Sequence, residues 1–73
     1  MIVRRSLTLS GHRTSLALEP AFWDMVERFA SADGLSLAAY IAAIDRTRGE
    51  DNLASAVRVA VLNRLIAAVP VEG

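Results

Sequence analysis

The chain has 73 residues, a single histidine and no cysteine, and its eight arginines balance eight acidic residues, so the formal net charge is zero. This composition excludes a disulfide framework and a Cys/His zinc site, and we expect neither a metal nor a cofactor. No run reaches the ~18 consecutive apolar residues of a membrane span, so we expect no membrane association and a cytoplasmic location. A core this small is marginal alone, and 53% of the residues are apolar, so we expect a homodimer.

Two short strands are predicted at the start of the chain, over 4–10 and 13–18. In the first, Leu7 and Leu9 share one face, and this period of two is typical of a half-buried strand. Gly11 supplies a turn signal between the strands. The second strand divides into two faces, with Thr14, Leu16 and Leu18 opposite Arg13, Ser15 and Ala17.

A first helix is predicted over 20–32. Pro20 favours a helix start, and Gly34 is typical of the position just after a helix end. Trp23 lies off the main apolar stripe, and we expect it to meet a partner chain or a later helix. The stripe itself recurs at helical spacing, at Phe22, Val26, Phe29 and Ala30.

A second helix is predicted over 37–46, with Ser36 as its N-cap. The polar stretch 46–51 contains a glycine and indicates a loop. The apolar stripe of this helix is formed by Leu37, Ile41 and Ile44.

A third helix is predicted over 53–68, capped by either Asn52 or Asp51. Asp45 and Arg58 are candidates for an ion pair between the second and third helices. One apolar face is expected on the third helix, made of Leu53, Val57, Val61, Leu62, Leu65 and Ile66.

The order of strand, helix, Gly-Leu-Ser break at 34–36 and second helix, over about 12–46, resembles the ribbon–helix–helix family, the Arc/MetJ repressor class. The segments 11–15 (Gly-His-Arg-Thr-Ser) and 52–56 (Asn-Leu-Ala-Ser-Ala) look like a bacterial subfamily of uncharacterised members. The resemblance implies a mainly α fold with a short β-ribbon. We therefore expect a single domain over 1–73, with core 12–46, an extra N-terminal strand at 4–10 and a third helix at 53–68.

The resemblance further implies an intertwined homodimer that binds double-stranded DNA and regulates transcription. Because a lone strand cannot satisfy its backbone groups, we expect the strand at 13–18 to pair with that of the second chain. The resulting ribbon would enter the major groove, where Arg13, Ser15 and Ala17 would read base edges. Backbone amides of Leu35, Ser36 and Leu37 would hold a phosphate. The residues implied in the dimer core are Leu16, Leu18, Phe22, Val26, Phe29 and Ile41.

The extra strand at 4–10 leaves a second interpretation open. If it lies beside 13–18, the dimer has four strands spanning about 14 Å, whereas the major groove is about 12 Å wide. The alternative is a protein-interaction module or accessory subunit that keeps the fold without binding DNA. An enzyme is not expected, because the chain lacks cysteine, has one histidine, and shows neither paired acids at a catalytic spacing nor a glycine-rich phosphate loop.

Overall fold

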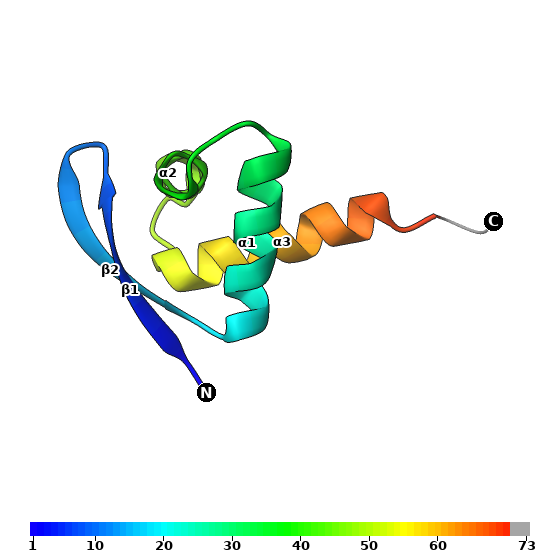
Figure 1. The fold of residues 1–73 in the computed structure, drawn as a ribbon, viewed down its shortest axis with the longest axis horizontal. Coiled ribbons are helices and arrows are strands. Elements are labelled where there is room, and N and C mark those ends of the chain that lie inside the picture. Colours follow the sequence, from blue (N-terminus) through cyan, green and yellow to red (C-terminus); the bar gives the residue numbers. More distant parts are fainter. Residues whose placement is uncertain (71–73) are drawn as a thin grey trace.

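A hairpin followed by three helices makes up the computed structural model, which describes residues 1–70. The elements are β1 (Val3–Leu9), β2 (His12–Leu18), α1 (Pro20–Ala32), α2 (Leu37–Thr47) and α3 (Leu53–Ala68). Figure 1 shows the hairpin along one side of the helices and the C-terminal half of α3 extending away on the opposite side. The predicted order of strands and helices is confirmed. The last three residues of the expected domain lie outside the described residues.

The two strands form an antiparallel hairpin, with Val3 opposite Leu18 at one end and Leu9 opposite His12 at the other. Ser10 and Gly11 are the two turn residues, with φ of 50° and 83°. Positive φ at both positions gives a type I′ turn, whose twist matches the paired strands and which favours glycine. β2 thus pairs with β1 of its own chain along one edge, and its pairing with the strand of a second chain through the other edge stays a prediction.

The predicted helix caps form through side-chain hydrogen bonds. Ser36 Oγ accepts from the backbone N–H of Ala39 at 3.1 Å, at the start of α2. Asn52 Oδ1 accepts from the N–H of Ser55 at 2.8 Å, which selects Asn52 over Asp51 as the cap of α3. Each bond satisfies an amide that has no partner inside the helix.

The core lies between the inner face of the hairpin and the three helices. Trp23 is 2% exposed, and its Nε1 donates to the backbone carbonyl of Val3 at 2.8 Å. Trp23, which was expected beside the main apolar stripe of α1, is therefore a core residue, and β1 of the same chain contacts it. The largest fully buried side chains are Trp23, Leu16, Leu18, Ile41, Val26, Val57 and Val61.

Phe22, predicted on the buried stripe of α1, is only half-buried and is covered by an arginine of α3. The Arg58 guanidinium lies 5.9 Å from the centre of the Phe22 ring, and its Nε donates to Glu19 Oε1 at 2.9 Å. The predicted ion pair between Asp45 and Arg58 is wrong, since Asp45 pairs instead with Arg48, three residues along. Arg58 therefore joins α3 to the start of α1.

A second arginine of α3 joins it to the other end of α1. Arg64 donates through two nitrogens to both carboxylate oxygens of Asp33 at 2.8 Å, and its guanidinium lies 4.2 Å from the ring centre of Phe29. The hydrogen bonds from Arg64 hold the pKa of the Asp33 carboxyl below its ordinary value. The two arginines clamp α1 at its N-terminal and C-terminal caps.

The single apolar face predicted for α3 is wrong, because this helix has two apolar faces. Val57 and Val61 are 0% and 1% exposed and belong to the core. Leu62, Leu65 and Ile66 are 54%, 38% and 60% exposed. The reason is the direction of the helix, whose second half extends beyond the hairpin and α1 (Figure 1).

Candidate nucleic-acid interface

The outward face of the hairpin is built from both strands. Residues on β1 that point away from the helices alternate with Val3, Leu7 and Leu9, which contact the core. The register brings each of them opposite a residue of the predicted DNA-reading set. The pairs are Arg4 with Ala17, Ser6 with Ser15 and Thr8 with Arg13.

Arginines stand at the two ends of this outward face. Arg4 and Arg13 are both exposed, as is Ser15, whereas Ala17 is half-buried. Thr8, the residue opposite Arg13, is four positions from Arg4, which places the two arginines about 13 Å apart along the strands. Arg4 was missed in the sequence, although its phase with the polar residues of its strand could have revealed it.

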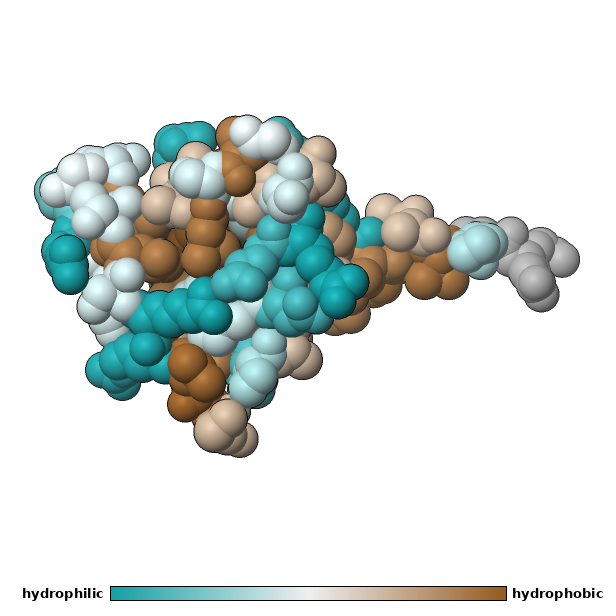
Figure 2. Space-filling model, viewed as in Figure 1, coloured by the Kyte–Doolittle hydropathy of each residue, from teal (hydrophilic) through white to brown (hydrophobic). Residues whose placement is uncertain are grey.

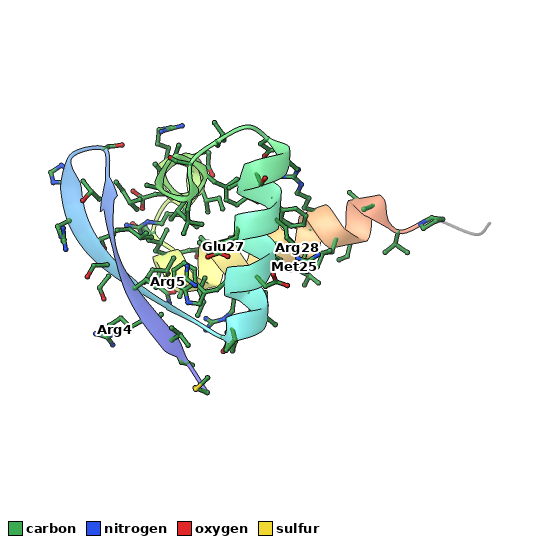
Figure 3. All side chains as sticks on the ribbon, viewed as in Figure 1. Arg4, Arg5, Met25, Glu27 and Arg28 are labelled. Carbon is green, nitrogen blue, oxygen red and sulfur yellow. The ribbon has the colours of Figure 1, made fainter. Side chains whose placement is uncertain are left out.

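The neighbouring Arg5 points the other way. Its Nη1 donates to Glu27 Oε1 at 2.6 Å, and its guanidinium lies 4.4 Å from the centre of the Trp23 ring. In Figure 3 Arg4 extends away from the body of the molecule while Arg5 lies near Glu27 of α1. Because side chains alternate between the two faces of the strand, Arg4 points outward without a carboxylate partner, whereas Arg5 forms an ion pair with α1.

Ion pairs within the chain account for most of its positive charge. Five of the eight arginines pair with a carboxylate: Arg5, Arg28, Arg48, Arg58 and Arg64. Over residues 1–70, Arg4, Arg13 and Arg46 have no such partner. Two of these three lie on the outward hairpin face, which carries no acidic side chain. A chain of zero net charge thus has a locally cationic surface.

The turn between α1 and α2 supplies only part of the predicted phosphate site. Gly34 has a φ of 69°, which lets the chain turn so that the Leu35 amide donates to the carbonyl of Ala30 at 2.9 Å. The Leu35 amide therefore already has an acceptor within the chain, and its role in holding a phosphate stays a prediction. The amides of Ser36 and Leu37 find no acceptor within the described part of the chain.

Base-reading and phosphate-holding residues of the predicted set lie apart within one chain. Arg13 lines a groove of about 320 Å³ beside Asp45 and Arg48, at the C-terminal end of α2. Ser36 caps the opposite end of this helix, whose 11 residues span about 16 Å. Arg4 and Arg13 therefore lie on the same face of the hairpin, whereas Ser36 lies far from Arg13.

Most of the residues predicted for a dimer core are enclosed by this chain itself. Leu16, Leu18, Val26 and Ile41 are at most 2% exposed, whereas Phe22 and Phe29 are half-buried. A place for them between two chains stays a prediction. Within residues 1–70 we find no cluster of three or more potential metal-ligating side chains, and no helix with the length and apolar character to cross a membrane.

A two-stranded antiparallel sheet followed directly by packed helices is consistent with the ribbon–helix–helix class of fold. A family model described as a ribbon-helix-helix domain matches residues 2–65. The chain belongs to this family. Ribbon–helix–helix domains form a non-enzymatic class that usually binds DNA, typically as homodimers that regulate transcription.

A solved structure, that of an uncharacterized protein from Bordetella pertussis Tohama I, is similar over nearly the whole chain. The two share 33% sequence identity with a TM-score of 0.78 over 99% of this chain. This chain covers 65% of the length of that protein, which is therefore longer. No curated protein matches the sequence.

Proposed function

We propose that the protein is a DNA-binding homodimer that regulates transcription in the bacterial cytoplasm, and that the outward face of its hairpin reads the DNA. The observation that carries this proposal is the pair of arginines, Arg4 and Arg13, that stand free of carboxylates on a face without acidic residues. Membership of a family whose domains usually bind DNA supports it.

The dimensions of the hairpin suit the major groove. Two strands lie about 4.8 Å apart, and a groove about 12 Å wide admits a two-stranded ribbon. Arg13 and Arg4 would each contact guanine or phosphate, and Ser15 would hydrogen-bond to base edges. Ala17 would contact a thymine methyl group. The amides of Ser36 and Leu37 would hold a phosphate outside the groove.

Binding to a selected DNA duplex tests the proposal. A duplex enriched from a random pool by the wild-type protein is labelled, and its affinity is measured by fluorescence anisotropy at several salt concentrations. Arg13→Ala should weaken binding about 10- to 100-fold, in keeping with the ~1–3 kcal/mol of a bidentate arginine contact. Arg46→Ala is the matched control, because Arg46 is exposed and unpaired in the described chain but lies on α2. Binding without salt dependence, or equal losses in both variants, would contradict the proposal.

A module that keeps the fold without binding DNA is the second candidate function. The zero net charge favours it, since non-specific DNA affinity depends on excess positive charge. Co-purification of the full chain from its native cells distinguishes the two. A protein partner in stoichiometric amount, with no nucleic acid, would support the interaction module.

A further inference from the structure

A polar groove lies where the turn of the hairpin meets the C-terminal end of α2, and we call it the turn groove. Figure 1 shows the hairpin turn beside α2. The groove has a volume of about 320 Å³, close to the lower limit of about 300 Å³ for pockets that bind small molecules. Its polar lining consists of Ser10, His12, Arg13, Thr14, Asp45 and Arg48.

Two arginines give the turn groove an excess of positive charge. Asp45 is the one acidic residue of its lining over residues 1–70, and this carboxylate is already paired with Arg48. Arg13 has no carboxylate partner in the same part of the chain. Two guanidinium groups therefore face a single carboxylate, and the charge of Arg13 is not compensated. A groove of this charge attracts an anion and disfavours a cation.

Hydrogen-bond donors approach the turn groove from two sides. On the α2 side, Arg48 donates through Nε to Asp45 and through Nη1 to the backbone carbonyl of Asp51. Its Nη2 has no acceptor among the described residues and is available to a ligand. On the hairpin side, the groove is lined by the unpaired guanidinium of Arg13 and by the hydroxyl group of Thr14.

Donors on two sides of a groove suit a phosphate group better than a carboxylate. A carboxylate has two oxygens in one plane, which match the fork of a single guanidinium. A phosphate monoester presents three acceptor oxygens in different directions, so one oxygen can accept from Arg13 and another from Arg48. Leu53, half-buried at the start of α3, adds an apolar wall on which a small organic group can pack.

We propose that the turn groove binds a small phosphate monoester and that this ligand releases the protein from DNA. Arg13 belongs both to the groove and to the outward hairpin face. Because one guanidinium cannot bond to a phosphate in the groove and to DNA at the same time, the two ligands exclude each other. The phosphate site stands on the groove alone, whereas release from DNA rests on the proposed function.

Nuclear magnetic resonance of the isotope-labelled full chain tests the phosphate site, with phenyl phosphate as the probe in phosphate-free buffer at constant ionic strength. The amide signals of Ser10, Arg13 and Arg48 should shift together and saturate. The signal of Arg28, which lies on α1 outside the groove, should not follow them. Benzoate, a carboxylate with the same ring, should bind more weakly than phenyl phosphate.

Two variants should change the affinity for phenyl phosphate in opposite directions. Arg13→Ala should weaken binding about tenfold or more, because a charge-assisted hydrogen bond is lost. Asp45→Asn should strengthen it, since the amide keeps an oxygen acceptor for Arg48 but removes a negative charge from the groove. Arg46→Ala is the matched control, because Arg46 is exposed on the same helix as Asp45 but does not line the groove.

Release from DNA is measured by fluorescence anisotropy of the labelled duplex that tests the proposed function. Phenyl phosphate should dissociate the wild-type complex at concentrations where sodium chloride of equal ionic strength does not. The Asp45→Asn complex should be released at lower concentrations of phenyl phosphate than the wild type. Because the coupling between two ligands is reciprocal, saturating DNA should weaken the binding of phenyl phosphate by the same factor.

Three results would overturn the inference: signals that do not saturate or that shift equally at Arg28, equal affinities of wild type and Arg13→Ala for phenyl phosphate, or a DNA complex that phenyl phosphate releases no better than sodium chloride. Failure of DNA binding is a separate outcome. A chain that binds phenyl phosphate in the turn groove but ignores DNA keeps the phosphate site and contradicts the proposed function. A chain that binds DNA without saturable binding of phenyl phosphate keeps the proposed function and loses this inference.

Discussion

The outward hairpin face and the outward face of α3 are two exposed surfaces with opposite chemistry. The hairpin face has hydroxyl groups and two free arginines, Arg4 and Arg13. Figure 2 shows hydrophobic residues along the part of α3 that extends from the body, and we call its exposed apolar residues the outward α3 stripe. The stripe consists of Val59, Leu62, Ile66 and Val69. The formal net charge of zero is therefore an average over the chain: the arginines of α3 are neutralised by carboxylates, whereas those of the outward hairpin face are not.

The difference follows from where the acidic residues lie. The first 18 residues contain no acid, so the outward hairpin arginines have no carboxylate nearby in the sequence. Glu19 and Asp33 stand at the two caps of α1, within reach of Arg58 and Arg64 when α3 packs across that helix. Packing of the helices thus determines which cations remain available to a ligand.

The largest expected effect is a loss of stability from a change in the core, which supports both surfaces. Trp23→Ala should lower the free energy of unfolding by about 3–5 kcal/mol, because Trp23 is 2% exposed and joins α1 to β1. Urea unfolding followed by circular dichroism measures it. Phe22→Ala is the control, and a loss as large as that of Trp23→Ala would show that the half-buried residue anchors the core instead.

The second prediction uses the salt dependence of DNA affinity to distinguish the two surfaces. Each arginine that contacts a phosphate adds about one to the slope of log affinity against log salt concentration. Arg4→Ala combined with Arg13→Ala should therefore lower the slope by up to about two per chain, or about four for the homodimer. Leu62→Glu should leave the salt slope per chain unchanged. Equal slopes in the double variant and the wild type would mean that the hairpin arginines do not contact DNA.

Ser36 and Asn52 provide a smaller, matched test. Either residue replaced by alanine should cost about 1 kcal/mol of stability, since each caps a helix through its side chain. Asp caps as well as Ser or Asn, so Ser36→Asp and Asn52→Asp should both stay stable. Only Ser36→Asp should weaken DNA affinity, by placing a negative charge at the predicted phosphate position. Equal DNA affinities of Ser36→Asp and Asn52→Asp would show that the N-terminus of α2 does not contact DNA.

The smallest expected effect is a loss of stability of the fold at low pH. Hydrogen bonds from Arg64 and Arg58 lower the pKa of Asp33 and Glu19 below their ordinary values of 3.8 and 4.5. Both ion pairs therefore contribute stability above pH 4.5 that is lost as the pH falls through the lowered pKa values.

The measurement for the acid prediction is the midpoint of urea unfolding between pH 6 and pH 2, chosen around those ordinary values. Arg58→Met combined with Arg64→Met should weaken the loss of stability with acid. An unaltered pH profile in that variant would show that these ion pairs do not set the acid response.

Local patterns predicted much of the candidate site as well as the elements. Alternation placed Arg13 and Ser15 on the exposed side of β2, and the same alternation holds for Arg4, which was overlooked. The occupied Leu35 amide was not predictable in the same way. Its bond to Ala30 depends on how the backbone turns at Gly34, and a phosphate site and a helix-terminating turn share the same residue types.

The sequence by itself determined the order of the strands and helices, their bounds to within one residue, the turn at Gly11, the cap Ser36 and the choice of Asp51 or Asn52 as the cap of α3. These features depend on spacing and on bonds between near neighbours. Tertiary structure decided what periodicity leaves open. It buried Trp23 in place of Phe22, since β1 covers one particular side of α1, and it divided the apolar residues of α3 between the core and the outward stripe. Such choices depend on which distant segments pack together, and a pattern of neighbouring residues carries no information about that.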